Sequence, residues 1–389
     1  MGGYVLSYDN RYYVALEEEF GRAGAVSAAS RFPGIKLTAR QRSEQRERRD
    51  KSGSRTFMGL APGHRRRTEY GVQLYMTEWA GGQAGPAYGP FFQAGLGAAP
   101  KFWAGGVAGS GSTASRIQFS GPHGLTPGQA VAAGGEIRFV AAVLDAQTVQ
   151  LAAPFSVSPA GGTLSGTVTY GPGRELPSVS IYDYWGPSAA VQRLLCGAMV
   201  DRLRIKVNAD FHEFEFSGPA ADLLDSSSFE SGEGGLEQYP QEPAVEAASF
   251  SVIPGNLGQA WMGPEPAQFF TVTEAEVEVD NDIEMRSREF GSTTPRGASP
   301  GIRRVAVSFS LYAATDAATK ALYQAARQYS PVSVMLQLGQ QAGQLCGVYL
   351  KSVVPEVPEF DDSGRRLEWK FSSSRAQGTV DDEIYVAFG

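Results

Sequence analysis

The residue types that most often carry enzyme chemistry are few in this chain and lie far apart. The three histidines are His64, His123 and His212, and none has a second histidine at the spacing of a metal site. The sequence contains no G-x-S-x-G elbow and no phosphate-binding Gly-rich loop. Cys196 and Cys346 cannot form a disulfide framework and have no metal-ligand spacing around them. The sequence therefore predicts a protein that is not an enzyme and uses no metal or other cofactor.

Charge is distributed very unevenly along the chain. The net charge is −7, but residues 36–67 hold eleven Lys or Arg against three Asp or Glu, an excess of eight, so the remainder sums to −15 (−7 minus 8). Residues 207–285 contain no Lys or Arg and seventeen Asp or Glu. Such asymmetry predicts complementary packing between copies, or a surface that repels another polyanion.

Residues 271–280 alternate strictly between apolar and acidic side chains, which predicts a strand with a row of carboxylates on one face. Like charges in a row destabilise a sheet, so the row is either a solvated face or the wall of a channel that keeps DNA phosphates from binding. Residues 202–207 place three cations on one face of a second strand, which could pair with acids of the same or a neighbouring subunit. The candidate wall acids are Glu213, Glu215, Glu274, Glu276, Glu278 and Asp280.

Two parts of the chain share an order of features, which predicts an internal duplication. Residues 66–75 and 303–312 both read as strands with Arg-Arg ahead of Leu-Tyr. The further matches are 35–38 with 277–280, 195–198 with 345–348, and 213–217 with 367–372. In this alignment Cys196 and Cys346 occupy equivalent buried positions, which is the usual structural role of a free cysteine.

The elements around these strands predict a mainly β fold in which each unit is a β-sandwich or open barrel with one flanking helix. Residues 315–327 form the clearest helix, capped by Thr315 or Asp316. Residues 90–97 and 189–194 are weaker helix candidates.

Residues 107–172 interrupt the first unit and begin and end in Gly/Ser-rich stretches. The short β-type runs between them predict a small inserted β-barrel on the surface. These runs are 116–119, 136–140, 148–151 and 166–170. The predicted domains are therefore a first unit of residues 1–106 and 173–245, the insertion 107–172, and a second unit 246–389. The sequence predicts neither a signal peptide nor a membrane anchor, and a soluble protein made inside the cell.

The run 277–286, the following 289–292, a Pro/Gly loop and 303–312 together resemble siphophage tail tube (major tail) proteins. In that family a strand ends in an Asn-rich turn, a long loop follows, and a second strand leads to the flanking helix. The first unit is similar, with a more arginine-rich loop, and the insertion resembles the small β-barrel added to many phage virion proteins. The resemblance covers most of the chain apart from the insertion and the N-terminal segment.

The resemblance implies a structural protein of the virion tail, made in the host cytoplasm. Tube domains join their sheets edge to edge into rings of six units that stack, so a chain with two units would form trimers. The implied partners are other copies, the tape measure, terminator and baseplate proteins, and the viral DNA that passes through an acidic lumen. Loops 38–66 and 281–302 would reach between rings. The candidate inter-ring residues are Arg40, Arg42, Arg46, Arg48, Arg49, Arg55, Arg286 and Arg288.

Three alternatives remain open at this point. A tail terminator or baseplate-proximal ring of similar fold would form one ring and stop. A nucleic-acid-binding protein would use the basic arm 36–67 for phosphate contacts, although this arm lacks aromatic residues before Phe57 and contains three acids. A carbohydrate-binding virion decoration would use the insertion, in which aromatic residues are scarce.

Overall fold

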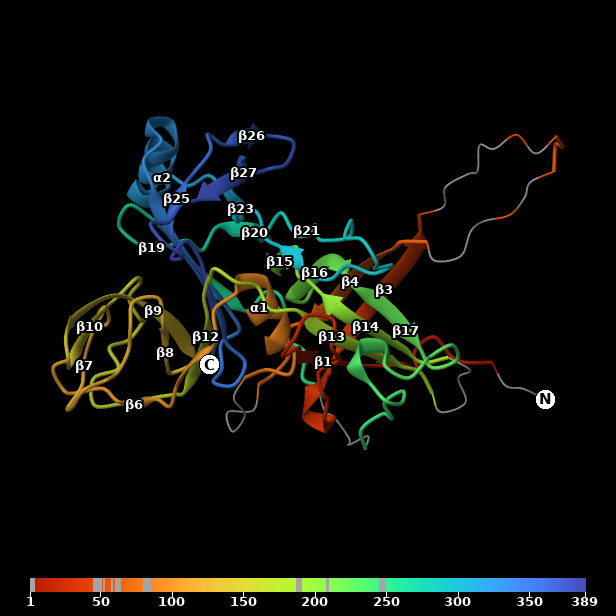
Figure 1. Ribbon diagram of the computed structural model, residues 1–389. Coiled ribbons are helices and arrows are strands. Elements are labelled where there is room, and N and C mark those ends of the chain that lie inside the picture. The colour runs from red at the N-terminus through yellow and green to blue at the C-terminus, as the bar shows by residue number, and fades with distance from the viewer. Residues whose placement is uncertain are drawn as a thin grey trace.

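The computed structural model describes residues 4–44, 51, 53–56, 59, 64–79, 85–186, 191–207, 210–244 and 250–389. Within these ranges the protein is mainly β, as predicted, with two α-helices and several antiparallel sheets. One long sheet curls into a half-barrel that runs through the centre of the molecule (Figure 1).

The first half of the molecule is defined here by its helix α1 and nine strands. Their bounds are β1 (Arg11–Leu16), β2 (Arg31–Phe32), β3 (Gly34–Ser43), β4 (Arg66–Tyr75), α1 (Gly89–Leu96), β13 (Val179–Tyr184), β14 (Arg193–Ala198), β15 (Arg202–Val207), β16 (Glu213–Ala220) and β17 (Asp222–Asp225). Short 3-10 helices lie at Ala28–Ser30 and Glu233–Gly235.

The second half is defined by helix α2 and the remaining C-terminal strands. Their bounds are β18 (Gly258–Gly263), β19 (Ala267–Gln268), β20 (Val272–Asp280), β21 (Glu284–Met285), β22 (Ala298–Ser299), β23 (Arg304–Tyr312), α2 (Ala317–Gln328), β24 (Val332–Leu338), β25 (Cys346–Val354), β26 (Glu359–Asp361), β27 (Glu368–Ala376) and β28 (Tyr385–Phe388).

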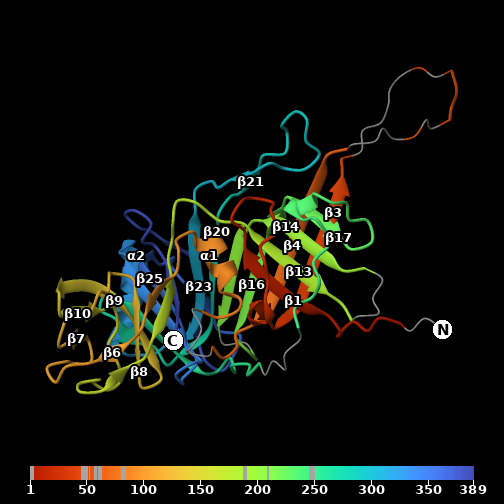
Figure 2. The same ribbon diagram turned by 60° about the horizontal axis from the view of Figure 1, so that its bottom comes forward.

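The long sheet crosses from one half to the other without a break. Its strand order is β19-β18-β24-β25-β27-β23-β20-β15-β16-β4-β3, and the two halves meet where β20 pairs with β15. A separate five-stranded sheet, β17-β14-β13-β1-β2, belongs to the first half alone. Figure 2 shows this sheet beside β4 and β16.

The antiparallel pairings of the two halves follow the same order. In the first half β3 pairs with β4, β4 with β16 and β16 with β15. In the second half β20 pairs with β23, β23 with β27 and β27 with β26. The series β1-β13-β14-β17 likewise parallels β18-β24-β25-β28, and α1 and α2 follow β4 and β23.

The helix predicted at 315–327 and the weaker candidate at 90–97 are both confirmed. Helix α2 begins at Ala317, and the preceding N-cap residue is Asp316, whose carboxylate accepts a 2.7 Å hydrogen bond from the Thr319 amide. Helix α1 occupies the predicted 90–97 segment almost residue for residue. The helix predicted at 189–194 is wrong where the structure describes it, because Arg193 and Leu194 begin strand β14, which is buried on both faces.

The insertion forms its own four-stranded sheet of order β7-β10-β9-β8. The bounds are β5 (Lys101–Trp103), β6 (Gly106–Val107), β7 (Arg116–Gln118), β8 (Ala130–Ala133), β9 (Glu136–Asp145), β10 (Thr148–Leu151), β11 (Thr163–Leu164) and β12 (Thr167–Tyr170). All four predicted runs contain strands, but β12 leaves the small sheet and pairs with β28 of the second half and with β5.

The core connects the two halves. Phe388, the penultimate residue, packs its ring 5.2 Å from Phe92 of α1 and 6.2 Å from Phe214 of β16, as centroid distances. One hydrophobic cluster contains residues of α1, β16, β20, β23 and β25 together. The two halves therefore share one hydrophobic core and do not form separate domains with a core each.

Candidate functional site

The candidate site is the solvent face of strands β3, β4, β16, β15, β20, β23 and β27, called here the open face. Along β20 the apolar Ala275, Val277 and Val279 are buried in the core, whereas Glu274, Glu276, Glu278 and Asp280 are more exposed. On β16, Phe214 and Phe216 are buried and Glu213 and Glu215 are partly exposed. All six predicted wall acids therefore lie on one face of one sheet.

The candidate wall acids share this face with the cations of strand β15. Strand β15 places Arg204 and Lys206 directly between acids of β16 and β20, whereas Arg202 lies between Ser217 and Asp280. Nη2 of Arg204 lies 3.3 Å from Oε2 of Glu278, and Nζ of Lys206 lies 2.6 Å from Oε1 of Glu215. The expected pairing of these cations with acids of the same subunit is confirmed.

The pKa shifts on the open face follow from these pairs. A hydrogen bond to Glu215 raises the pKa of Lys206. Partial burial opposes the charge of Arg204, but the carboxylates of Glu278 and Glu276 outweigh it and raise the pKa of Arg204. Both cations stay charged at neutral pH, so the face presents neutralised pairs to solvent.

The predicted inter-ring residues fall into separate places. Arg40 and Arg42 are exposed residues of strand β3, not of a loop, and Arg55 is exposed. Arg46, Arg48 and Arg49 lie outside the described residues. Arg286 and Arg288 lie in the 281–302 loop, where Arg286 forms an ion pair with Glu289. The described candidates are therefore spread over β3 and the two loops, and Arg286 and Arg288 line a hollow together with Arg66 and Arg67.

The two long loops contact each other at one end of the sheet. The Arg65 guanidinium donates a 3.0 Å hydrogen bond to the carbonyl of Arg288, and the Arg66 amide donates to the carbonyl of Thr293. One loop connects the paired strands β3 and β4, and the other connects the paired strands β20 and β23. These hydrogen bonds hold the two loops together at this end of the sheet.

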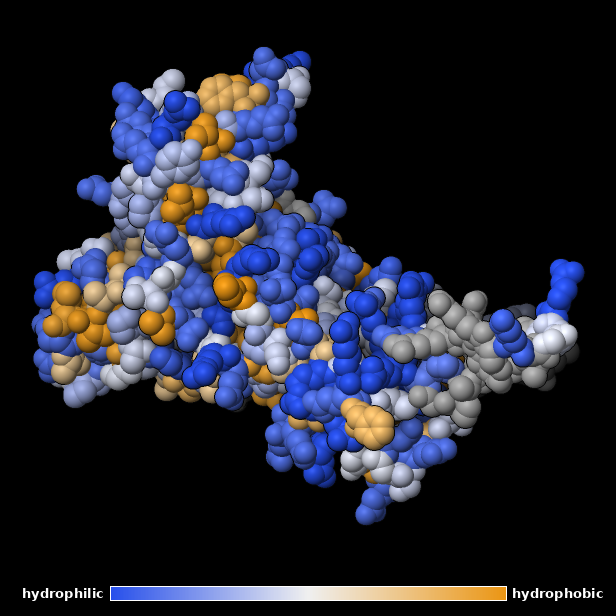
Figure 3. Space-filling view, turned by 45° about the horizontal axis from the view of Figure 1, so that its top comes forward, coloured by the Kyte–Doolittle hydropathy of each residue, from blue (hydrophilic) through white to orange (hydrophobic). Residues whose placement is uncertain are grey.

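Strands β3 and β26 each have one side without a strand partner in the part of the chain that the structure describes. Strand β3 ends the long sheet, and β26 pairs only with β27. Figure 1 shows the two edges far apart. Beside β26, apolar side chains gather on the surface at the α2 end of the molecule (Figure 3), where Phe360 is 51% exposed. Each half thus has at least one unpaired strand edge in the part of the chain that the structure describes.

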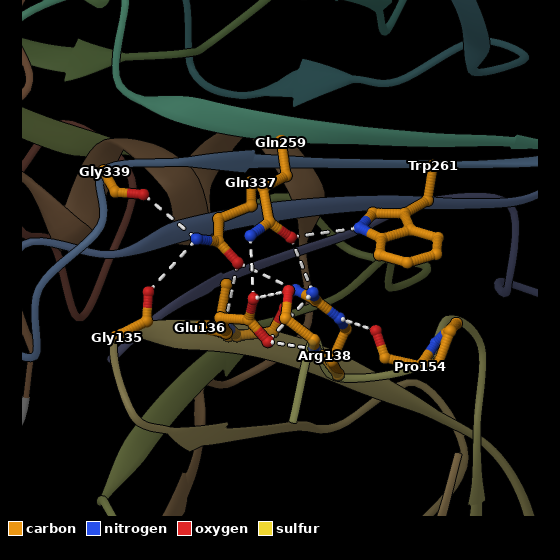
Figure 4. A network of polar contacts seen from close by, with 10 residues as sticks. Gly135, Glu136, Arg138, Pro154, Gln259, Trp261, Gln337 and Gly339 are labelled. Carbon is orange, nitrogen blue, oxygen red and sulfur yellow. Dashed lines mark hydrogen bonds and ion pairs between the residues drawn. The ribbon is translucent and has the colours of Figure 1, made fainter. Parts of the chain in front are cut away.

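A buried polar cluster fixes the insertion to the second half (Figure 4). Arg138 of β9 is fully buried and its guanidinium donates hydrogen bonds to Gln337 of β24 at 2.8 Å and Gln259 of β18 at 2.6 Å. It also forms a 3.2 Å ion pair with Glu136 and lies over the Trp261 ring. Nothing in the spacing of these residues signalled the cluster, because its members come from three strands distant in sequence.

The charges of this cluster are compatible with its burial. Burial lowers the pKa of Arg138 to about 10, which leaves it protonated at neutral pH. Burial alone would favour protonation of Glu136, but hydrogen bonds from Ser156 and Gln259 prevail and lower the pKa of Glu136. The pair is therefore ionised and hydrogen-bonded on both sides, as a buried ion pair must be.

The insertion lies on the side of β18, β24 and β25 that faces away from the core. Trp261, Met335 and Tyr349 pack against its Ile137 and Phe139, as members of one cluster. Their strand neighbours, such as Met262, Val334 and Val348, belong to the central core instead. Since the central core separates these strands from the open face, the insertion and the open face are on opposite sides of the molecule.

The residues considered for catalysis are not brought together. Cys196 packs beside Tyr182 and Leu224 outside the central core, whereas Cys346 is part of that core. The predicted equivalence of the two thiols is therefore wrong: they lie on opposite faces of their strands. Burial raises the pKa of both thiols. Among the described residues no group of three His, Cys, Asp or Glu side chains is placed to hold a metal ion.

Neither helix in the described part of the chain has the length and apolar character needed to cross a bilayer.

Comparison with known proteins gives partial likenesses among solved structures alone. No protein-family model and no curated protein matches the chain. Among solved structures, the SPP1 tail tube, determined by solid-state NMR and cryo-EM, matches 34% of this chain and 79% of its own, with 13% sequence identity and a TM-score of 0.28. At that TM-score the likeness carries no argument about function.

Proposed function

We propose that this protein is a structural subunit of a phage tail tube, whose long sheet joins those of other copies edge to edge into a hollow ring. The observation that carries the proposal is the long sheet itself. It passes through both halves with a repeated strand order, and among the described residues it has an unpaired edge at β3 in the first half and at β26 in the second. A single ring of strands removes both edges at once, and closure is how β proteins eliminate reactive edges.

Two tandem tube units in one chain form part of the same proposal. The matched pairings support it, as does a shared irregularity: the ladder between β3 and β4 skips Ile35, and the ladder between β20 and β23 skips Thr273. These bulges lie opposite equivalent residues, next to the pairs that Leu74 and Leu311 make. With two units per chain, three copies complete a ring of six units.

In this proposal the open face is the lumen wall and the insertion lies outside the tube. At the centre of the wall the carboxylates of Glu278 and Glu215 pair with Arg204 and Lys206, so these two cations are not free to bind DNA phosphates. Exposed ion pairs of this kind contribute less than about 1 kcal/mol each to stability. In this proposal the ion pairs serve to provide a surface along which a polyanion moves without binding.

Electron microscopy of the purified full-length chain tests the proposal, together with light scattering to count the copies in each particle. Hollow tubes built of three-copy rings are the expected result. Rings that never stack would indicate a terminator-like or baseplate-proximal component. A protein that stays monomeric at high concentration, with or without the other tail proteins, would refute the proposal. Duplex DNA binding that persists at about 0.2 M salt would instead favour the basic arm as a nucleic-acid site.

A further inference from the structure

The joint between the two halves shows how one edge of this sheet recognises another. Strand β15 pairs antiparallel with β20, so that Arg202 is opposite Asp280, Arg204 opposite Glu278, and Lys206 opposite Glu276. One strand therefore contributes cations and the other carboxylates. The Arg204–Glu278 ion pair spans the joint at 3.3 Å.

Strand β26 holds the place in the second half that β15 holds in the first. Tyr75 is opposite Glu213, and Tyr312 is opposite Glu368. On the far side of these two glutamates lie Lys206 and Asp361, respectively. Lys206 and Asp361 are therefore equivalent. Arg204 precedes Lys206 by two residues, as Glu359 precedes Asp361, so Glu359 is the equivalent of Arg204.

The charges at these equivalent places are reversed. In the first half Nζ of Lys206 lies 2.6 Å from Glu215; in the second, Nζ of Lys370 lies 2.6 Å from Asp361. The same cross-strand pair is thus present twice with opposite polarity. The hydrogen bond from Lys370 lowers the pKa of Asp361, so its carboxylate is ionised at neutral pH.

The charges of strand β3 are likewise opposite to those of β20, its equivalent in the second half. Counted from the shared bulge, Lys36 is equivalent to Glu274, Arg40 to Glu278, and Arg42 to Asp280. Lys36, Arg40 and Arg42 are exposed. Within the described part of the chain none of them has an ion pair, and neither has Glu359. These charges on the edges of β3 and β26 are therefore available to pair with charges of another copy.

We propose that β26 of one copy joins β3 of a second copy, antiparallel, with Glu359 opposite Arg40 and Asp361 opposite Thr38 and diagonal to Lys36. This inference rests on the proposed ring and specifies its joint. The polarity is opposite to that of the internal joint. Pairing β26 with a β20 edge would set acids against acids, and pairing β15 with a β3 edge would set cations against cations, which destabilises a ladder. Charge thus determines which edges meet, and first and second halves must alternate around the ring.

The core side of the proposed joint is complementary in size. Phe360, stacked 5.3 Å from Trp369, is equivalent to Ile205, and Ala39 is equivalent to Val277, the residue opposite Ile205. The exposed Phe360 ring would therefore be covered by strand β3, which presents only the methyl group of Ala39 at this position. The joint is shorter than the internal one, because β26 has three residues and β15 has six.

Charge reversal tests the joint. Glu359→Arg sets like charges against Arg40, and Arg40→Glu sets them against Glu359, so each variant should assemble at a roughly tenfold higher concentration than the wild type. The chain with both changes restores the pairing and should assemble as the wild type does. In a mixture of the two single variants, β26 of each variant matches β3 of the other, so copies should join only in strict alternation. A ring of three copies cannot alternate between two variants. Closed three-copy rings should therefore be absent from the mixture.

Cross-linking gives a second, independent readout. Under oxidation, Arg40→Cys with Glu359→Cys in one chain should form disulfides between copies, whereas Arg40→Cys with the out-of-register Glu356→Cys should not. If all charge variants form rings as readily as the wild type and no cross-link forms, the joint is wrong although the ring proposal stands. If the wild type forms no ring at all, the proposed function itself fails.

Discussion

Arg138 offers the sharpest test of how the insertion is held. Its guanidinium donates to the carbonyls of Pro154 and Ile137, both at 2.8 Å, and to the side chains of two glutamines, besides pairing with Glu136. Arg138→Ala removes all of these interactions at once. It leaves the carboxylate of Glu136, which is only 13% exposed, without its counter-ion.

The expected loss is large, because a buried charge loses its partner. Removing one member of a buried ion pair costs about 3–5 kcal/mol. Arg138→Lys keeps the charge but not the planar fork, so it can satisfy only part of these acceptors and should fall between the wild type and the alanine variant. Arg116→Ala, at an exposed position of the same small sheet, should change the free energy of unfolding by no more than about 0.5 kcal/mol.

Urea denaturation combined with limited proteolysis measures both the size and the place of the effect. In the wild type, the insertion should resist protease until the whole chain unfolds. In Arg138→Ala, cleavage should begin in the Gly-rich segments on either side of the insertion, well before the main transition. If Arg138→Ala and Arg116→Ala unfold at the same urea concentration and are cleaved alike, the buried cluster does not hold the insertion.

Three further outcomes follow from single side chains. Burial lowers the pKa of His212 below its ordinary 6.5, so the unfolded chain binds a proton that the folded chain rejects. Stability should therefore fall as the pH drops below about 6.5, by up to about 1.4 kcal/mol for each pH unit, and His212→Gln should flatten that slope in urea titrations. Asn281 donates 2.9 Å hydrogen bonds to the carbonyls of Gly95 and Val200, so Asn281→Ala should cost about 1–3 kcal/mol in the same assay, whereas the exposed Asn256→Ala should cost little. Both cysteines are buried with raised pKa values, so thiol reagents should label them only after the chain unfolds.

Patterns with a strict period were readable from the sequence. The alternation in 271–280 gave the two faces of β20 correctly, and the spacing of 315–327 gave α2 with its cap. The segment 189–194 misled because Arg193 and Leu194 open a strand that is buried on both faces and has no alternation to detect.

Properties that depend on neighbouring strands were not readable. The sequence showed the acids of β20 and the cations of β15 separately, but not that these two strands pair with each other. The proposed alignment of 35–38 with 277–280 chose the right strands and missed their register by four residues, since the ladders make Leu37 equivalent to Ala275. Register depends on hydrogen-bonded partners, which a local pattern does not contain.

The reversed charges also bear on the chain before it assembles. An unpaired strand of ten residues such as β3 is an aggregation hazard, because it can pair with any exposed edge, including another β3. In this protein two β3 edges would bring Lys36, Arg40 and Arg42 against the same cations, and the short β26 edge would meet its own acids. Self-pairing of like edges is therefore disfavoured while the β26–β3 joint is favoured. The charges that would select the correct joint in a ring would thus also keep separate copies soluble until they meet in the productive orientation.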